Sequence, residues 1–193
     1  MYIPTILGLT YQETTTPEAV FEVWRQNEAH DPGWQQCARD HGYDSWESWR
    51  MNRFTQLGGE NPTWWRFNIH EPLITVPGFF GGPSKTWIKL HYRKPALVRF
   101  SEFAHPKAFH ENEKIMSLLH AFPKETEVTG LVTDTNDIVI IEGTHRCTAL
   151  AIAGTIGIEI DTKITISLTS WKENDFPVPD PAPAGPKRVP LDK

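Results

Sequence analysis

The sequence predicts an α+β protein with one main domain and with helices concentrated near its N-terminus. Three observations predict this class. Helix starts that contain proline recur in the first 60 residues, short β-branched runs occur between residues 128 and 168, and prolines dominate after residue 176. We therefore divide the chain into a small helical N-terminal subdomain (1–60), an α+β core (61–175) and a proline-rich flexible tail (176–193) that cannot form a core.

The composition is that of a globular protein. The 193 residues are 39% hydrophobic and 22% charged, which is enough for one domain with a sizeable core. The net charge of −5 disfavours binding to a nucleic-acid backbone over a broad surface. Cys37 and Cys147 make neither a disulfide framework nor a zinc motif, no run has the length of a membrane span, and residues 1–5 do not resemble a signal peptide. We therefore expect a cytoplasmic protein with no membrane contact.

Three helices are predicted in the N-terminal subdomain. Thr15 and Glu18 have capping-box spacing around Pro17, and Asp31-Pro32 is a second helix start whose helix ends near Gly42. A third helix is predicted from residue 45 to residue 57, before a pair of glycines. Tryptophans recur at helical spacing in these segments, which favours core packing over base stacking for Trp24, Trp46 and Trp49.

The middle of the chain is rich in helix breakers and predicts short extended pieces. These are Trp65–His70, Leu73–Val76, Trp87–Tyr92 and Ala96–Phe100. Trp64 and Trp65 are adjacent, so they cannot both face one core from a strand. The glycine-rich run from Gly78 to Lys85 lacks the spacing of a Walker A loop, and both a lid over a ligand and a plain turn remain open for it.

Helices and strands alternate in the last third. A helix is predicted at Glu111–Phe122, and Val128–Thr133 and Ile138–Ile141 form a predicted hairpin around a turn at residues 135–137. An alanine-rich helix at Thr148–Ala153 and a final strand at Ile158–Leu168 follow.

The segment between the second hairpin strand and the alanine-rich helix carries the most chemical information. It reads Glu142-Gly143-Thr144-His145-Arg146. A strand, a glycine turn and a helix start present backbone N–H groups that favour an anion, most often a phosphate, and Arg146 suits bidentate phosphate contact. The spacing alone leaves a second interpretation open, an ordinary corner in which Arg146 pairs with a nearby carboxylate.

This segment resembles the phosphate-binding box of the ParB/sulfiredoxin superfamily. The box is Gly-Glu-Arg-Arg in ParB proteins, Gly-Cys-His-Arg in sulfiredoxins and close to Asp-Gly-x-His-Arg in the free-serine kinases of that fold. The order of elements from Glu111 to Leu168 matches as well. The resemblance implies a ParB/sulfiredoxin-like mixed sheet with packed helices, and a nucleotide such as ATP, or another small phosphorylated ligand, at the box.

The resemblance also implies roles for single residues. Thr144 stands where sulfiredoxins carry their reactive cysteine, which argues against sulfinic-acid reduction because a hydroxyl cannot replace a thiolate. Glu142 would hold Mg²⁺ or accept a proton, or it would simply orient His145 or Arg146. His145 would bind phosphate or be a buried structural histidine. Thr144 and Thr148 offer hydroxyls to a phosphate, although Thr148 could equally bond back into its own helix.

Accessory cations come from the glycine-rich run and the basic stretch after it. Lys85, Lys89 and Arg93 could surround an anionic ligand, or they could form a solvated face.

Three functions compete. The first is a phosphate- or nucleotide-binding protein, catalysing Mg²⁺-dependent phosphoryl transfer to a small hydroxyl substrate, or nucleotide hydrolysis, if it is an enzyme. The second is a non-catalytic module that responds to a nucleotide. The third is a ParB-like DNA-binding or nuclease protein, which ranks below the others because of the acidic charge and the lack of a helix-turn-helix pattern.

Overall fold

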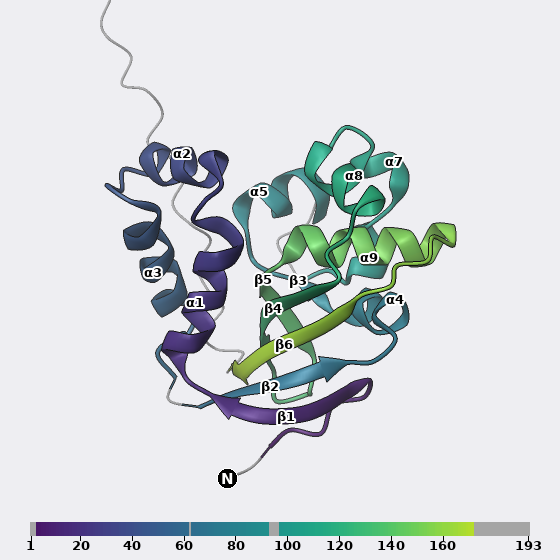
Figure 1. Ribbon diagram of the computed structural model, residues 1–193, viewed down its shortest axis with the longest axis horizontal. Coiled ribbons are helices and arrows are strands. Elements are labelled where there is room, and N and C mark those ends of the chain that lie inside the picture. The colour runs from purple at the N-terminus through teal and green to yellow at the C-terminus, as the bar shows by residue number, and fades with distance from the viewer. Residues whose placement is uncertain (1–2, 62, 93–96, 172–193) are drawn as a thin grey trace, which may run out of the picture.

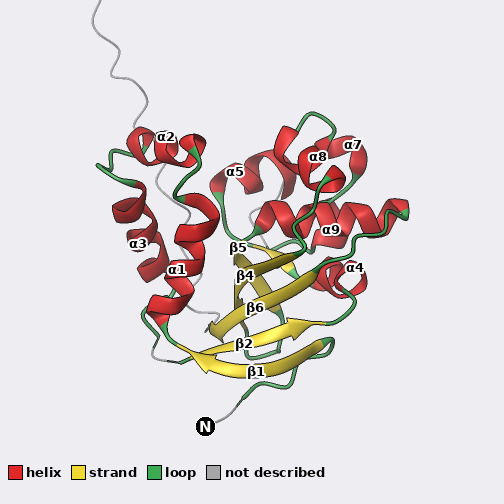
Figure 2. Ribbon diagram, viewed as in Figure 1, coloured by secondary structure: helices red, strands yellow, loops and turns green. Residues whose placement is uncertain are grey.

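A mixed sheet with helices on both faces forms the centre of the protein, and it confirms the predicted α+β class (Figures 1 and 2). The computed structural model describes residues 3–61, 63–92 and 97–171. Within these residues six strands form one sheet in the order β1-β2-β6-β4-β5-β3. The strands are β1 (Leu9–Thr15), β2 (Trp64–Ile69), β3 (Phe80–Gly81), β4 (Glu125–Val132), β5 (Ile138–Glu142) and β6 (Lys163–Ser170). β4 runs parallel to β6, and β3 runs parallel to β5, whereas the other neighbours are antiparallel.

The three predicted N-terminal helices are confirmed as α1 (Pro17–Glu28), α2 (Pro32–Asp40) and α3 (Trp46–Gln56). Side-chain oxygens cap each of them, because Thr16, Asp31 and Ser45 accept hydrogen bonds from first-turn amides. The cap of α1 is therefore Thr16 and not Thr15. The helices share an apolar core, which includes Trp24, Trp46, Trp49 and Trp64.

Strand β1 was not predicted, although it pairs with β2 along its whole length. Its sequence, Leu-Thr-Tyr-Gln-Glu-Thr-Thr, is polar because β1 is an edge strand whose middle residues are all exposed. An edge strand with no buried face lacks the apolar alternation by which a strand is predicted. Residues 9–15 thus lie in the sheet, and α1–α3 are inserted between its two outermost strands on that side.

The neighbouring tryptophans on β2 separate two cores. Trp64 is fully buried against α1 and α3, whereas Trp65 packs into the main core on the opposite face of the sheet. This arrangement follows from the alternation of side chains along a strand.

The main core lies beneath α8 (Glu113–His120) and α9 (Thr144–Ile156), which pack against each other. The β4–β5 hairpin is confirmed, with Leu131 opposite Val139 and with Asn136 in the left-handed region at the turn. The helix predicted at Thr148–Ala153 is longer than expected and begins at Thr144, directly after Gly143. The last strand begins at Lys163 rather than at Ile158.

Two of the predicted extended pieces are wrong. Leu73–Val76 belongs to α4 (Pro72–Thr75) and the 3₁₀ turn that follows it (Val76–Gly78). Trp87–Tyr92 is helical, in α5 (Lys85–Trp87) and a π-helical turn (Ile88–Tyr92). Its alternation of apolar and polar residues spans six residues only, and over such a length a helix that buries a few aromatic rings gives a similar pattern.

Two further short helices, α6 (Phe100–Phe103) and α7 (Pro106–Phe109), follow in the chain. Of the piece predicted at Ala96–Phe100, Ala96 lies outside the described residues, Arg99 forms a single bridge to Phe80, and Phe100 starts α6. The proline-rich tail (176–193) and Arg93 also lie outside the described residues.

Candidate functional site

A cleft of about 880 Å³ lies between the N-terminal helices α1–α3 and the helices α5, α8 and α9. Figure 1 shows α1–α3 as one group and α5, α8 and α9 as another. One wall of the cleft comes from α1, α2 and α3, and the other from α8 and the loop before α5. The ends of β4 and β5 and the start of α9 close it, so residues 142–146 all line the cleft.

Gly143 makes the corner between β5 and α9. Its φ of 95° lies in the left-handed region, and a Cβ there would lie 2.5 Å from Cγ1 of Val128. Glycine is required for both reasons. Glycine has no side chain to cap the helix, so no side chain of Gly143 bonds the first-turn amides of α9 at Thr144, His145 and Arg146. The positive end of the helix dipole therefore lies at the cleft.

Arg146 is held by two groups in this corner. One guanidinium nitrogen donates to Oε1 of Glu142, and the other donates to Oγ1 of Thr126 at 2.5 Å. The Glu142 side chain is 4% exposed and that of Arg146 is 12% exposed. Burial raises the pKa of the Glu142 carboxyl, and the Arg146 charge acts in the opposite direction. The corner thus contains an ion pair between Arg146 and a nearby carboxylate, which is one of the two interpretations of the sequence. It also lines a cleft, which the other interpretation, a phosphate site, requires.

The rings of His145 and Trp87 lie in a T-shaped arrangement, with 5.2 Å between ring centroids and 74° between ring planes. Burial lowers the pKa of His145 to about 4, and the positive charges of Lys114 and Arg146 act in the same direction. The imidazole is therefore neutral at pH 7. It can offer one N–H to a ligand, but it brings no charge.

The other predicted site residues are dispersed. Thr148 is fully buried, and its hydroxyl donates to the carbonyl of Thr144 at 2.8 Å, inside α9. Lys85 begins α5, next to the cleft residue Ser84. Lys89 is exposed and does not line the cleft. Cys147 is fully buried, and burial raises its pKa to about 12, as expected for a core residue rather than a nucleophile.

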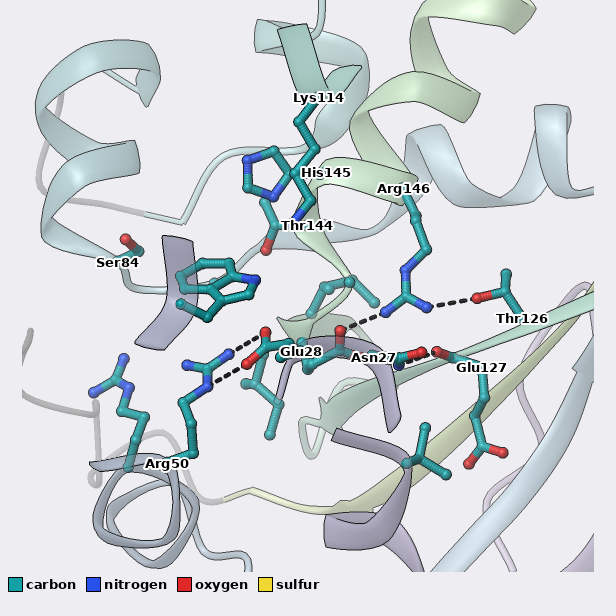
Figure 3. A pocket seen from close by; sticks show the side chains of 18 of the residues that line it. Asn27, Glu28, Arg50, Ser84, Lys114, Thr126, Glu127, Thr144, His145 and Arg146 are labelled. Atoms are coloured by element: carbon teal, nitrogen blue, oxygen red, sulfur yellow. Dashed lines mark hydrogen bonds and ion pairs between the residues drawn. The ribbon is translucent and has the colours of Figure 1, made fainter. Parts of the chain in front are cut away.

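The opposite wall holds charged residues that the sequence analysis missed. Glu28 of α1 is 6% exposed and accepts two hydrogen bonds from Arg50 of α3, as Figure 3 shows. The Arg50 guanidinium lies 5.0–5.3 Å from the ring centres of three tryptophans: Trp24, Trp34 and Trp49. The sequence did contain a signal for this pair. Glu28 lies one turn beyond Trp24 on the apolar stripe of α1, where an unpaired charge would be costly, so its position predicts a cationic partner.

Polar contacts join the N-terminal helices to the sheet and to α8. Asn27 of α1 places its amide nitrogen 3.5 Å from Oε2 of Glu142 and 3.4 Å from the carbonyl oxygen of Glu127. Lys114 of α8 reaches Asp31, the cap of α2, with 3.5 Å between Nζ and Oδ2. Deeper down, the indole N–H of Trp24 donates to the Thr129 hydroxyl at 3.0 Å. The helical wall therefore contacts the box and its surroundings directly.

Metal ligands are sparse in the described part of the chain, where no group of three or more His, Cys, Asp or Glu side chains is placed to hold a metal ion. In the same residues no helix combines the length and apolar character that crossing a membrane requires. No family model, no curated protein and no solved structure matches the chain.

Proposed function

We propose that the cleft binds a nucleotide or another small phosphorylated ligand, with one phosphate at residues 143–146. The observation that carries this proposal is the glycine corner, where α9 begins without a side-chain cap at the edge of a cleft of about 880 Å³. A volume of several hundred Å³ suits a ligand of nucleotide size. The resemblance of the box to that of the ParB/sulfiredoxin superfamily supports the same ligand class.

Each box residue has a defined contribution in this proposal. The amides of the first turn of α9 and the hydroxyl of Thr144 donate to phosphate oxygens. Neutral His145 adds one further donor. Arg146 supplies positive charge close by, although two of its nitrogens already bond Glu142 and Thr126.

In its catalytic form the proposal is phosphoryl transfer from ATP to a small hydroxyl substrate, or nucleotide hydrolysis. Mg²⁺ is usually bound by one or two carboxylates together with phosphate oxygens and water. Glu142 fits this role in part, because Arg146 takes Oε1 whereas Oε2 has its contact with Asn27 at 3.5 Å. The metal would neutralise phosphate charge, and Glu142 would hold it or accept the proton of an attacking hydroxyl.

A non-catalytic nucleotide-responsive module is the alternative, and the contact between Asn27 and Glu142 favours it. A ligand that displaces Glu142 from its partners would also disturb α1, and the disturbance would reach all three N-terminal helices because they share one core. Such a module would report ligand binding to a partner through these helices.

Thermal unfolding in the presence of phosphate, AMP, ADP and ATP, each with and without Mg²⁺, tests the binding site. A ligand at a hundred times its Kd stabilises the folded state by about 2.7 kcal/mol. We expect this shift in the wild type and at least a tenfold loss of affinity in Arg146→Lys, with Arg39→Lys on the exposed face of α2 as the matched control. The absence of a shift with every one of these compounds would refute the proposal.

Turnover separates the enzyme from the module. We expect ATP consumption in the presence of free amino acids or sugars if the protein is an enzyme, and loss of that turnover in Glu142→Gln. Ligand binding without turnover under all these conditions would leave the module as the function of the cleft.

A further inference from the structure

Lys114 is a cationic residue of the cleft that lies outside the box. It comes from the first turn of α8, which packs against α9, and its side chain lines the same cleft as Thr144 and His145. Figure 3 shows Lys114 above Thr144 and His145, and Arg146 beside them. The positive charges of Lys114 and Arg146 both act on His145, so both cations lie near the start of α9.

The cations of the cleft differ in how firmly they are held. Arg146 and Arg50 each pair with a buried carboxylate, and their own side chains are 12% and 11% exposed. Lys114 is 46% exposed, and its partner Asp31 is 44% exposed at 3.5 Å. An exposed pair of this length contributes little to stability, so a ligand can displace it at small cost.

The second contact of Lys114 is equally easy to exchange. Its ammonium lies 5.1 Å from the ring centre of Trp34, a cation–π distance at a partly exposed site. Asp31 does not depend on the lysine either, because its Oδ1 caps α2 by accepting from the Gly33 amide at 2.8 Å. Movement of Lys114 into the cleft would therefore leave α2 capped.

We propose that Lys114 binds a second phosphate group and that the ligand therefore carries at least two phosphates, as a nucleoside di- or triphosphate does. The inference rests on the proposed phosphate site at residues 143–146. The first phosphate lies on the amides of α9, and the next lies beside Lys114, which exchanges Asp31 for phosphate oxygen. A flexible ammonium with three donors suits this role.

Calorimetric titration of AMP, ADP and ATP into the full chain tests the inference. Lys114→Met should weaken ADP and ATP binding at least tenfold and AMP binding less than threefold, whereas Lys114→Arg should stay within threefold of the wild type. Asp31→Asn keeps an oxygen to cap α2 but removes the competing charge, so it should tighten ATP binding two- to threefold.

Lys124→Met is the matched control, because Lys124 also forms an exposed ion pair, with Asp161 at 3.3 Å, and the substitution removes the same charge at a residue that does not line the cleft. It should change the affinity for each nucleotide less than threefold. If Lys114→Met binds ATP within twofold of the wild type, or loses AMP as strongly as ATP, the role of Lys114 is wrong while the box site stands. If wild-type protein binds none of the three nucleotides, the proposed function itself fails.

Discussion

Glu142 and Arg146 form a buried ion pair across the corner between β5 and α9. Glu142 is the last residue of the strand, Arg146 lies in the first turn of the helix, and Gly143 between them has a φ of 95°. The pair spans the turn by which the helix leaves the sheet. It also keeps a carboxylate and a guanidinium at the edge of the cleft.

Gly143→Ala should destabilise the protein by about 2–4 kcal/mol. The substitution places a side chain in the left-handed region and a Cβ within 2.5 Å of Val128 Cγ1, so strain and overpacking add. Gly157→Ala is the control at the other end of α9, because its φ is 73° but nothing lies within 4 Å of the added Cβ. It should cost about 1 kcal/mol. Urea unfolding of both variants measures the difference, and equal losses would contradict the close packing at Gly143.

Arg146→Ala should cost about 3–5 kcal/mol at neutral pH, because it leaves a buried carboxylate without its partner. Burial already raises the pKa of Glu142, and removal of the arginine raises it further. The variant is then most stable at a pH where Glu142 is protonated. It loses stability as the pH rises, first through the pKa of Glu142 in the unfolded chain and then through its higher pKa in the folded protein.

The loss caused by Arg146→Ala should therefore be smaller at pH 5 than at pH 8. Urea unfolding of the wild type and the variant at both values checks this. Glu142→Gln/Arg146→Met, which removes both charges, should recover most of the stability at pH 8. If the double variant is as unstable as the single one, the loss does not come from the unpaired charge.

His145 should make the folded protein less stable in acid. Burial lowers its pKa to about 4, whereas an unfolded histidine titrates near 6.5, so the unfolded chain takes up a proton that the folded one does not. Stability contributed by the neutral imidazole is complete above about pH 6.5. It falls as the pH is lowered toward 4, by at most about 3 kcal/mol.

A comparison of His145→Gln with the wild type isolates this contribution. Its unfolding free energy should fall less between pH 7.5 and pH 4.5 than that of the wild type. His110→Gln, at a side chain that is 69% exposed, should follow the wild-type pH profile. Parallel profiles for all three proteins would show that His145 takes up its proton equally in both states.

The hydrogen bond from Trp24 to Thr129 should contribute to holding the helical wall on the sheet. Both residues are buried, and the donor–acceptor distance is 3.0 Å. Thr129→Val keeps the shape but leaves the indole N–H without its acceptor, which should cost about 1–3 kcal/mol. Thr155→Val, at an exposed residue near the end of α9, should cost less than 1 kcal/mol.

A double-mutant cycle with Trp24→Phe separates the bond from the packing. In the Trp24→Phe background no indole N–H remains, so Thr129→Val should cost clearly less than it does in the wild type. Additive losses would mean that the hydrogen bond itself contributes nothing.

Local signals predicted the five longer helices, α1, α2, α3, α8 and α9. Pro17, Pro32 and Ser45 each mark a helix start because capping and a fixed φ act within a few residues of the cap. The β4–β5 hairpin was also predictable, since two apolar runs flank a short polar turn. Helix formation at Trp87–Tyr92 was not, because its rings pack on Phe103 and Phe109, which follow later in the chain.

The sequence by itself determined the corner of the candidate site. Gly143, Glu142 and Arg146 are neighbours in the chain, so the turn, the helix start and their ion pair follow from interactions over four residues. Only the tertiary structure placed α1 and α8 around that corner. Asn27 meets Glu142 across 115 positions, and Lys114 meets Asp31 across the cleft. Contacts between such distant residues depend on how helices pack on a sheet, and no local pattern of residues specifies them.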